Sequence, residues 1–241
     1  MNITEKLERS KSDEAIDFSK MGCLYSKDPL VSVKDSKKII VQPVWKVKED
    51  FEGKMYTDYI KSHPNYQDVL VRSKVLRLLK MAANSLPNKY KLVVRAGHRP
   101  VEVQKRLLIE VMQDFKFQHP GVSDKKSLEH ARMFVSDPDT KLPEHCCGAA
   151  VDVCLYDTIN KRLVNFGSTM NDDSAISYLH AEEITTKQKE NRIFLLKTML
   201  DAGFSSYYAE WWHYSYGDQI WAWFYKEKAS IYGIAEVKNS R

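Results

Sequence analysis

The chain has 241 residues, of which 43% are hydrophobic and 29% charged, and its formal net charge is +5. This balance is typical of a globular protein that buries a sizeable core, and it excludes a disordered chain. The absence of a run of about 18 apolar residues excludes a transmembrane helix, and the interleaving of 37 Lys and Arg with 32 acidic residues argues against a dedicated nucleic-acid binder.

The N-terminal region is polar and lacks the apolar segment of a signal peptide. We therefore expect no Sec-type export and a cytoplasmic protein. Thr4 is a candidate N-cap for a short helix that runs toward Phe18. Residues 21–38 are expected to form a loop, residues 38–44 a strand and residues 51–54 a turn.

The middle of the chain alternates between helix and strand signals. Residues 68–85 place apolar side chains at helical spacing, and residues 90–95 are rich in β-forming side chains. Pro100 is well placed as the first residue of a helix that carries apolar residues up to Met112, and residues 119–121 end that region. Residues 123–143 are polar with weak periodicity, so we expect a loop that contains a short helix.

The C-terminal part begins with a strand over residues 149–155, followed by a helix over residues 187–202 that Gly203 ends. Aromatic residues then dominate residues 204–216, which are expected to form strands, and the last dozen residues are expected to fray. This order predicts an α+β domain with a small antiparallel sheet flanked by helices.

The cysteines are Cys23, Cys146, Cys147 and Cys154, and the last three lie close together in the sequence. A secreted disulfide framework would instead space its cysteines through the chain. The cluster therefore indicates either a metal site or reduced thiols in the core of a cytosolic protein.

Three short motifs carry groups that can do chemistry. The first offers the imidazole of His145 and, seven residues later, the carboxylate of Asp152, with Gly148 between them. Nitrogen and oxygen ligands of this kind suit Zn²⁺. Taken alone, a histidine beside a cysteine pair is more often a packed core residue.

The second motif is Glu210 followed three residues later by His213, a pair that can combine a metal ligand with a proton acceptor. Residues three apart share one side of a helix or turn but point to opposite faces of a regular strand. Either the strand begins or bulges here, or the pairing is accidental. The third motif is Arg99 at a strand-to-helix junction, where a fixed guanidinium could stabilise an oxyanion.

Together, these motifs resemble VanX-type D-alanyl-D-alanine dipeptidases, which belong to the zinc peptidases that share the D,D-peptidase/Hedgehog fold. The resemblance rests on a strand followed by Arg-Pro and a helix, then His-x-x-Gly-x-Ala-x-Asp, then Glu-x-Trp-His after a Gly-Phe pair. It covers about residues 39–225 and includes a stretch at residues 165–169 that is similar to the family's Asp-Met-Gly-Thr.

The resemblance implies roles for individual residues. His145, Asp152 and His213 would hold one zinc ion per chain. Glu210 would be the general base that takes a proton from the attacking water and passes it to the leaving amine. Arg99 would polarise the scissile carbonyl and hold the oxyanion.

Five departures from the family pattern concern the substrate. Ala96 and His98 stand where the family has Asp and Tyr, Pro143 and Cys146 where it has Ser, and Asn165 where an Asp helps to bind the substrate's free amine. A neutral amide attracts an ammonium group less strongly than a carboxylate does. We therefore expect Asn165 and His98 to be substrate-binding positions with an altered grip.

The cysteines offer an alternative ligand set, because thiolates also bind zinc well. Cys146 or Cys147 could replace a ligand beside His145. Gly148 and Asp152 nevertheless keep the family spacing, which favours the His-Asp-His set.

The leading expectation is a zinc-dependent dipeptidase that acts on D-Ala-D-Ala or related D-amino-acid dipeptides. The alternatives are a peptidoglycan D,D- or L,D-carboxypeptidase or endopeptidase of the same fold, or a non-catalytic Hedgehog-like module that binds zinc. The last has no need of Glu210 or Arg99.

The resemblance also divides the chain into a polar extension over residues 1–38, a catalytic domain over residues 39–225 and a tail over residues 226–241. The expected partner is a small D-amino-acid peptide, with no nucleic acid and no membrane insertion. The oligomeric state is left open.

Overall fold

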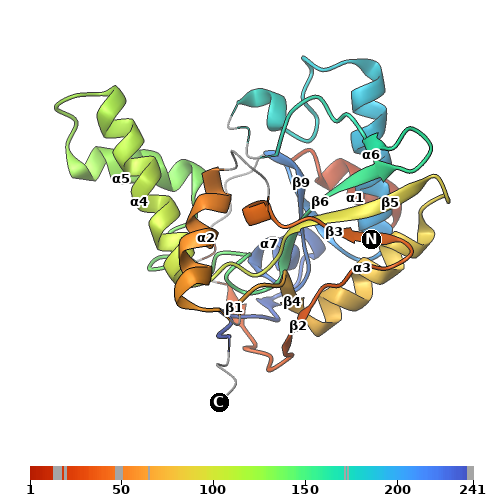
Figure 1. Ribbon diagram of the computed structural model, residues 1–241, viewed down its shortest axis with the longest axis horizontal. Helices are drawn as coiled ribbons and strands as arrows, with labels where there is room; N and C mark the ends of the chain where they lie inside the picture. The colour runs from red at the N-terminus through yellow and green to blue at the C-terminus, as the bar shows by residue number, and fades with distance from the viewer. Residues whose placement is uncertain are drawn as a thin grey trace.

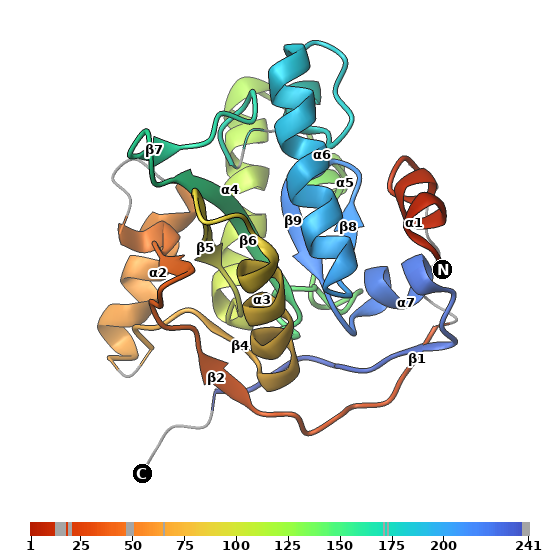
Figure 2. The same cartoon turned by 90° about the vertical axis from the view of Figure 1, so that its right-hand side faces the viewer.

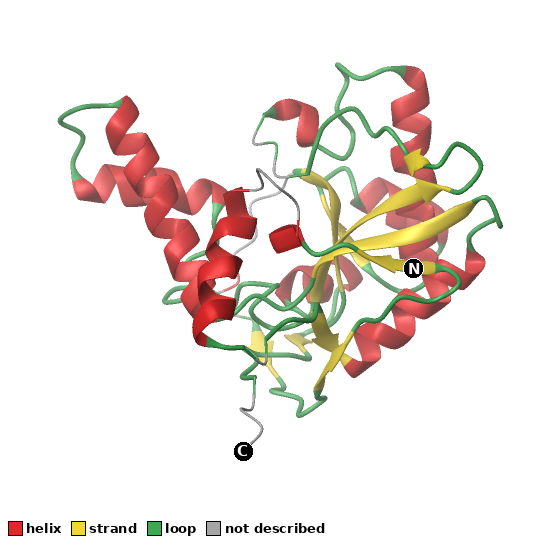
Figure 3. Ribbon diagram, in the orientation of Figure 1, coloured by secondary structure: helices red, strands yellow, loops and turns green. Residues whose placement is uncertain are grey.

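The structure is a computed structural model that describes residues 1–12, 18, 21–46, 51–64, 66–170, 172 and 174–237. These residues form a six-stranded sheet, two small two-stranded sheets and the α-helices that surround them (Figure 1, Figure 3). The α+β class expected from the sequence is confirmed.

The central sheet has the strand order β3-β5-β6-β9-β8, and β7 pairs with β6 off this path. Its strands are β3 (Ile39–Val41), β5 (Tyr90–Ala96), β6 (Ala150–Asp157), β7 (Arg162–Leu163), β8 (Ser205–Tyr207) and β9 (Glu210–Ser215). Every neighbouring pair is antiparallel except β3 and β5, which are parallel. A parallel pair needs a long crossover, and the connection here holds α2 (Phe51–Ser62), β4 (Leu70–Arg72) and α3 (Ser73–Ser85).

Two helices cover one face of this sheet, as Figure 2 shows. They are α3 and α6 (Thr186–Asp201), and α6 begins with a capping box between Thr185 and Gln188. Their apolar side chains meet those of the central strands in the main core. Its fully buried members include Leu79, Leu92, Leu155, Leu195 and Leu196.

A helical arm projects from the body, at the left of Figure 1. It consists of α4 (Val101–Gln118) and α5 (Asp124–Phe134), which pack on each other through Leu108, Ala131 and Val135. The helix α4 ends at Gln118, directly before the predicted stop at residues 119–121, and Pro100 is its N-cap rather than its first residue.

Further elements tie the chain ends to the body. The helix α1 (Ile3–Arg9) contacts α6, and α7 (Gln219–Tyr225) follows β9. The strand β1 (Gly22–Cys23) pairs in parallel with β10 (Ala229–Ser230), and β2 (Leu30–Ser32) pairs antiparallel with β4. Two 3₁₀ turns, η2 (Val44–Lys46) and η3 (Ala175–Ser177), complete the described elements.

The N-terminal helix differs from the prediction at both ends. Its N-cap is Asn2 rather than Thr4, because the Asn2 side chain accepts the Glu5 backbone N–H at 3.0 Å and the Glu5 carboxylate accepts the Asn2 N–H at 2.9 Å. This reciprocal capping box fixes the start of the helix. The helix ends at Arg9 instead of running toward Phe18.

Two further local predictions are wrong. Residues 51–54 open helix α2 rather than forming a turn. The helix expected from residue 68 begins only at Ser73, because residues 70–72 pair with β2 as a strand. Tertiary strand pairing has overridden a weak helical periodicity here.

The prediction that the last dozen residues fray is wrong for residues 230–237. Ser230, Tyr232 and Ala235 are buried, and the Ala235 N–H donates to the carbonyl oxygen of Cys146 at 2.8 Å. This C-terminal segment therefore packs against the loop that carries His145. The division into extension, catalytic domain and tail stays a prediction.

Candidate active site

Three side chains that are far apart in the sequence meet on one face of the central sheet. His145 lies in the turn before β6, Asp152 lies on β6, and His213 lies opposite Asp152 on the neighbouring strand β9. One potential ligand atom from each lies within 4.8 Å of the others, and all three residues are buried. Asp152 bridges the two rings, because its Oδ2 lies 3.3 Å from His145 Nε2 and its Oδ1 lies 3.3 Å from His213 Nδ1.

The orientation of the His145 ring is fixed by a backbone carbonyl. Its Nδ1 donates to the carbonyl oxygen of Gly97 at 2.8 Å, which directs Nε2 toward Asp152. A backbone partner of this kind selects the tautomer of a metal-binding histidine. The turn closes at Gly148, whose φ of +68° favours glycine and whose N–H donates to the His145 carbonyl at 3.0 Å.

Glu210 lies beside His213, with 3.5 Å between Glu210 Oε2 and His213 Nδ1. The first alternative stated for this pair applies, since β9 begins at Glu210 and its pairing with β8 shifts register between Ser206 and Tyr207. The Glu210 side chain is 34% exposed, whereas that of His213 is 6% exposed. Glu210 therefore borders the buried histidine and also reaches solvent.

The charges of the cluster shift its pKa values. Burial acts to raise the pKa of Asp152, but the two histidines outweigh it and hold that pKa well below its usual range. Burial acts to lower the pKa of His213, but hydrogen bonding to Asp152 and the charges of Asp152 and Glu210 raise it to about 9. Burial also raises the pKa of Glu210, although its exposure to solvent moderates this effect. The group thus concentrates negative charge around imidazole nitrogens, as a cation site does.

Arg99 is tied to the same group from the other side. Its backbone N–H donates to the His145 carbonyl at 3.0 Å, and its Nη1 donates to Gln104 Oε1 at 2.8 Å. Gln104 is itself held by a bond of 2.7 Å from its Nε2 to the carbonyl of Ser136. The guanidinium acts to lower the pKa of Glu210 against the larger effect of burial, so the two charges lie within electrostatic reach of each other.

The structure gives His98 and Asn165 local contacts, and their expected substrate-binding role stays a prediction. The ring of His98 is buried, with Nε2 at 3.2 Å from the Ala235 carbonyl and Nδ1 at 3.3 Å from the Tyr66 hydroxyl. Asn165 is exposed, and its Oδ1 accepts the Gly167 N–H at 2.9 Å. These contacts fix local structure at both positions.

The cysteines do not join the cluster of metal-binding groups in the described part of the chain. Cys146, Cys147 and Cys154 are buried, and no described pair forms a disulfide. Burial raises the pKa of Cys146 to about 12 and that of Cys147 well above its usual value. Both thiols are thus packed in the core, outside the group of candidate ligand atoms.

Sequence reasoning missed three contributors. They are the carbonyl of Gly97, the side chain of Gln104, and Glu144, whose charge raises the pKa of His213 and of Tyr207. Gln104 could have been found, because it is a polar residue in the first turns of the helix that follows Arg99. A lone backbone carbonyl has no sequence signal.

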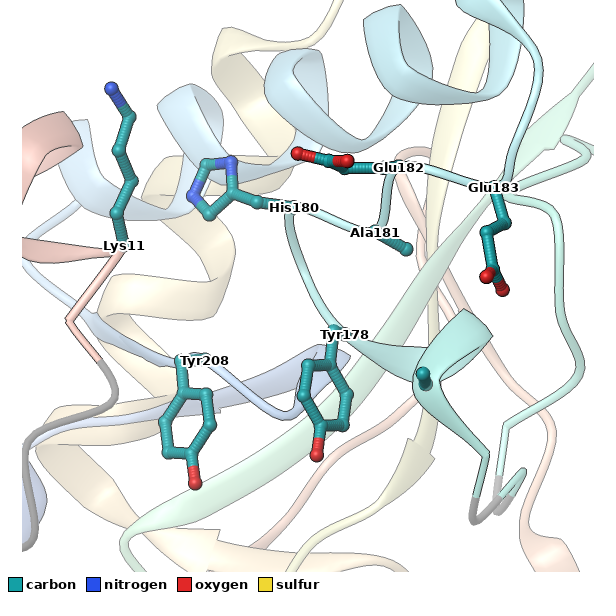
Figure 4. A pocket seen from close by; sticks show the side chains of 8 residues that line it. Lys11, Tyr178, His180, Ala181, Glu182, Glu183 and Tyr208 are labelled. Atoms are coloured by element: carbon teal, nitrogen blue, oxygen red, sulfur yellow. The ribbon is translucent and has the colours of Figure 1, made fainter.

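A separate hollow lies near the turn between β8 and β9 (Figure 4). It is lined by Lys11, Ala175, Tyr178, His180, Ala181, Glu182, Glu183 and Tyr208. In Figure 4 the rings of Tyr178 and Tyr208 point to the same side, and His180 extends toward Lys11. Tyr207 connects this region to the cluster, because its ring centroid lies 5.1 Å from that of Tyr208 and 6.0 Å from that of His213.

A family model described as D-ala-D-ala dipeptidase matches residues 54–231. Two buried imidazoles and a carboxylate around one point, with a further carboxylate and a guanidinium beside them, form the kind of site found in metallopeptidases. The chain belongs to this family of peptidases, and it is a metallopeptidase.

Two curated relatives are similar in sequence. A D-alanyl-D-alanine dipeptidase of Synechocystis sp. is 28% identical over 217 residues, which cover 73% of this chain and 87% of that protein. A D-alanyl-D-alanine dipeptidase of Enterococcus faecalis is 31% identical over 93 residues, which cover 39% of this chain and 46% of that protein.

Solved structures show weaker likenesses. A mutant of the vancomycin resistance D,D-pentapeptidase VanY in complex with Zn(II) matches with a TM-score of 0.39 at 18% identity, covering 68% of this chain and 83% of that chain. The LD-carboxypeptidase LdcB matches with a TM-score of 0.39 at 16% identity, covering 67% of this chain and 71% of that chain. Likenesses of this size carry no argument about function.

Among the described residues, no helix combines the length and the apolar character that crossing a membrane requires.

Proposed function

We propose that the protein is a zinc-dependent dipeptidase that hydrolyses D-Ala-D-Ala or closely related D-amino-acid dipeptides. The observation that carries this proposal is the convergence of His145, Asp152 and His213 beside Glu210, in a chain that belongs to the D-ala-D-ala dipeptidase family. The two relatives described above carry the same activity in their names.

The donor set fits zinc. Two neutral imidazole nitrogens and one carboxylate oxygen are ligands that Zn²⁺ prefers, and three protein ligands leave a position for water or substrate. Asp152 Oδ1 is buried and lacks a hydrogen-bond partner of good geometry among the described groups. A buried carboxylate oxygen without a hydrogen-bond partner is costly, so this atom favours a cation that Asp152 ligates. Bound zinc would supply Lewis-acid activation of the attacking water and of the scissile carbonyl.

Glu210 is the residue we assign to proton transfer. Its carboxylate lies at the edge of the cluster, close to His213 and open to solvent. From there it can take the proton of the attacking water and return it to the leaving amine nitrogen. A positioned carboxylate in this role contributes about 10²–10⁴-fold to the rate.

Arg99 is the residue we assign to the developing oxyanion. Its guanidinium is anchored by Gln104, and its backbone N–H is bonded to His145, so its position relative to the cluster is fixed. A preorganised cation costs no reorganisation when charge develops on the carbonyl oxygen. The stabilisation of the oxyanion is lost if the Arg99 guanidinium moves away.

The test uses Glu210→Gln, with Glu190→Gln on the exposed surface of α6 as the matched control. Metal content is measured by mass spectrometry and hydrolysis of D-Ala-D-Ala by release of D-alanine. We expect Glu210→Gln to keep zinc and to lose at least about 10²-fold in kcat, while Glu190→Gln retains activity. Near-normal turnover by Glu210→Gln would contradict the assigned mechanism.

The same assay separates the alternatives. A dipeptidase prefers the free dipeptide, whereas a carboxypeptidase or endopeptidase accepts a muropeptide whose amine is blocked. Zinc binding without turnover on either substrate would indicate the non-catalytic module. We further propose a cytoplasmic location, where the enzyme would remove or recycle dipeptides of the cell-wall precursor.

A further inference from the structure

Two buried polar atoms next to the proposed zinc site have no hydrogen-bond partner among the described residues. They are Nε2 of His213 and Oδ2 of Asp218. His213 is 5% exposed and Asp218 is 0% exposed. His213 Nε2 can donate a hydrogen bond when it carries the ring proton. Asp218 Oδ2 acts only as an acceptor when the carboxyl group is ionised, so the two atoms are chemically complementary.

The role of His213 dictates what its Nε2 requires. Nδ1 is the nitrogen that faces Asp152, at 3.3 Å from Oδ1. If Nδ1 binds the metal, the neutral ring carries its proton on Nε2, and this N–H points away from the metal. Metal-binding histidines almost always donate that proton to a carboxylate, a carbonyl or water. His145 meets this requirement through the Gly97 carbonyl, whereas His213 has no equivalent bond.

The strand geometry places Asp218 on the correct side. Ser215 follows His213 by two residues on β9, so both side chains point to the same face of the sheet. The Ser215 hydroxyl donates to Asp218 Oδ1 at 2.9 Å, and the backbone N–H of Trp221 donates to the same oxygen at 2.8 Å. Oδ1 therefore accepts two hydrogen bonds, and Oδ2 accepts none from the described groups.

Electrostatics agree with this placement. Burial and the charge of Glu144 raise the pKa of Asp218 to about 6, while His213 acts to lower it. The two groups are therefore within electrostatic reach. A buried carboxylate is costly unless a donor satisfies it, and Asp218 Oδ2 accepts no hydrogen bond from the described groups.

We propose that Asp218 is a positioning residue for His213, whose Nε2–H it accepts at Oδ2 through one bridging water molecule. The bond would hold the ring in the tautomer that leaves Nδ1 free for the metal, and it would raise the basicity of that nitrogen. This inference rests on the proposed function only in requiring that a metal binds at His213.

The test must separate this role from the capping of α7, since Asp218 is also the N-cap of that helix. Serine caps helices about as well as aspartate but is too short to reach His213. Asparagine keeps the cap and the reach but removes the charge. Ser123→Ala, which removes the N-cap of α5 on the distant helical arm, controls for a general loss of helix capping.

Zinc affinity is measured by competition with a chromogenic chelator, together with the Tm of the metal-free proteins. We expect Asp218→Ser to bind zinc about 10- to 100-fold more weakly than wild type, with Asp218→Asn between them and Ser123→Ala unchanged. In ¹⁵N-labelled zinc-loaded protein, the Nε2 proton of His213 should be protected from exchange in wild type and unprotected in Asp218→Ser. Zinc affinity and proton protection in Asp218→Ser equal to those of Ser123→Ala would overturn the proposal.

Asp218→Asn decides alone if the serine variant does not fold: weaker zinc binding supports the role, and wild-type affinity overturns it. These readouts do not depend on turnover. A wild-type protein that binds no zinc contradicts the proposed function itself, whereas equal zinc binding by wild type and the Asp218 variants contradicts only the role of Asp218.

Discussion

The side chain of His98 offers a quantitative test of whether it serves the substrate or the fold. It is 3% exposed, and its ring lies between the hydroxyl of Tyr66 and the carbonyl of Ala235. Burial lowers the pKa of His98 from 6.5 to about 4. The folded protein therefore holds this ring neutral at pH values where the unfolded chain protonates it.

The sign of the effect follows from proton binding in the two states. Above about pH 6.5 neither state binds a proton at His98, so this residue adds no pH dependence. Between pH 6.5 and about 4 only the unfolded chain binds it, and the free energy of unfolding falls as the pH falls. With about 1.4 kcal/mol per pH unit, this window of about 2.5 units gives a loss of about 3 kcal/mol.

The assay is urea unfolding followed by tryptophan fluorescence across this pH window, for wild type and His98→Gln. Glutamine can still donate to the Ala235 carbonyl but does not titrate, so the difference between the two slopes isolates His98. We expect wild type to lose about 3 kcal/mol more than the variant between neutral pH and pH 4, with kcat/KM for D-Ala-D-Ala little changed at neutral pH. Equal slopes, or a raised KM in a variant of unchanged stability, would refute a structural role.

Three further predictions concern the loop and helix around this residue and the thiols. A Cβ at Gly97 would clash with the backbone carbonyl of Leu70, so Gly97→Ala should destabilise the protein by about 1–3 kcal/mol in the same urea assay and weaken zinc binding; unchanged stability would contradict this. Gln104→Ala should lower kcat/KM by up to about 10²-fold with zinc content unchanged, because Arg99 loses its anchor; a full rate would show that the anchor is dispensable. A thiol reagent should modify Cys23 readily in the folded protein and the other three cysteines only after unfolding, because only Cys23 is partly exposed; rapid reaction of a second thiol would argue against their burial.

The sequence predicts those features that depend on local patterns. The helices over residues 101–118 and 186–201 and the strand over residues 90–96 follow from hydrophobic periodicity, β-forming side chains and Pro or Gly boundaries. The strand over residues 70–72 does not, because it exists through pairing with a strand about 40 residues earlier. The parallel pairing of β3 with β5 is likewise set by the long connection between them, so the sequence of either strand does not predict it.

The candidate site divides in the same way. His145, Asp152 and His213 could be selected from the sequence because residue type and spacing match a known family. The groups that orient these side chains could not be selected in this way. The Gly97 carbonyl, for example, accepts a hydrogen bond from the ring of His145, which lies 48 residues later in the sequence. The bond between Gln104 and Arg99 depends on how Pro100 sets the direction of α4. Ligand identity is thus local information, whereas ligand orientation depends on the fold.

The pair of Glu210 and His213 shows why the strand must be irregular at this point. Between β8 and β9, Ser206 pairs with Tyr214, and the next residue of β8 pairs with Glu210, four residues earlier on β9. Three residues of β9 therefore bulge out of the ladder with β8, although His213 keeps its register with β6 on the other side. A bulge redirects side chains that a regular strand would send to opposite faces.

Aromatic packing holds this bulge in place. The two residues between Glu210 and His213 are Trp211 and Trp212, which are 3% and 2% exposed. Trp211 stacks on Phe166 with 4.2 Å between ring centroids and donates its indole N–H to the Ser168 hydroxyl at 2.9 Å. Burying two large aromatic side chains offsets the ladder hydrogen bonds that the bulge gives up. The tryptophans thus supply the local stability that lets a carboxylate and an imidazole three residues apart on a strand face the same side.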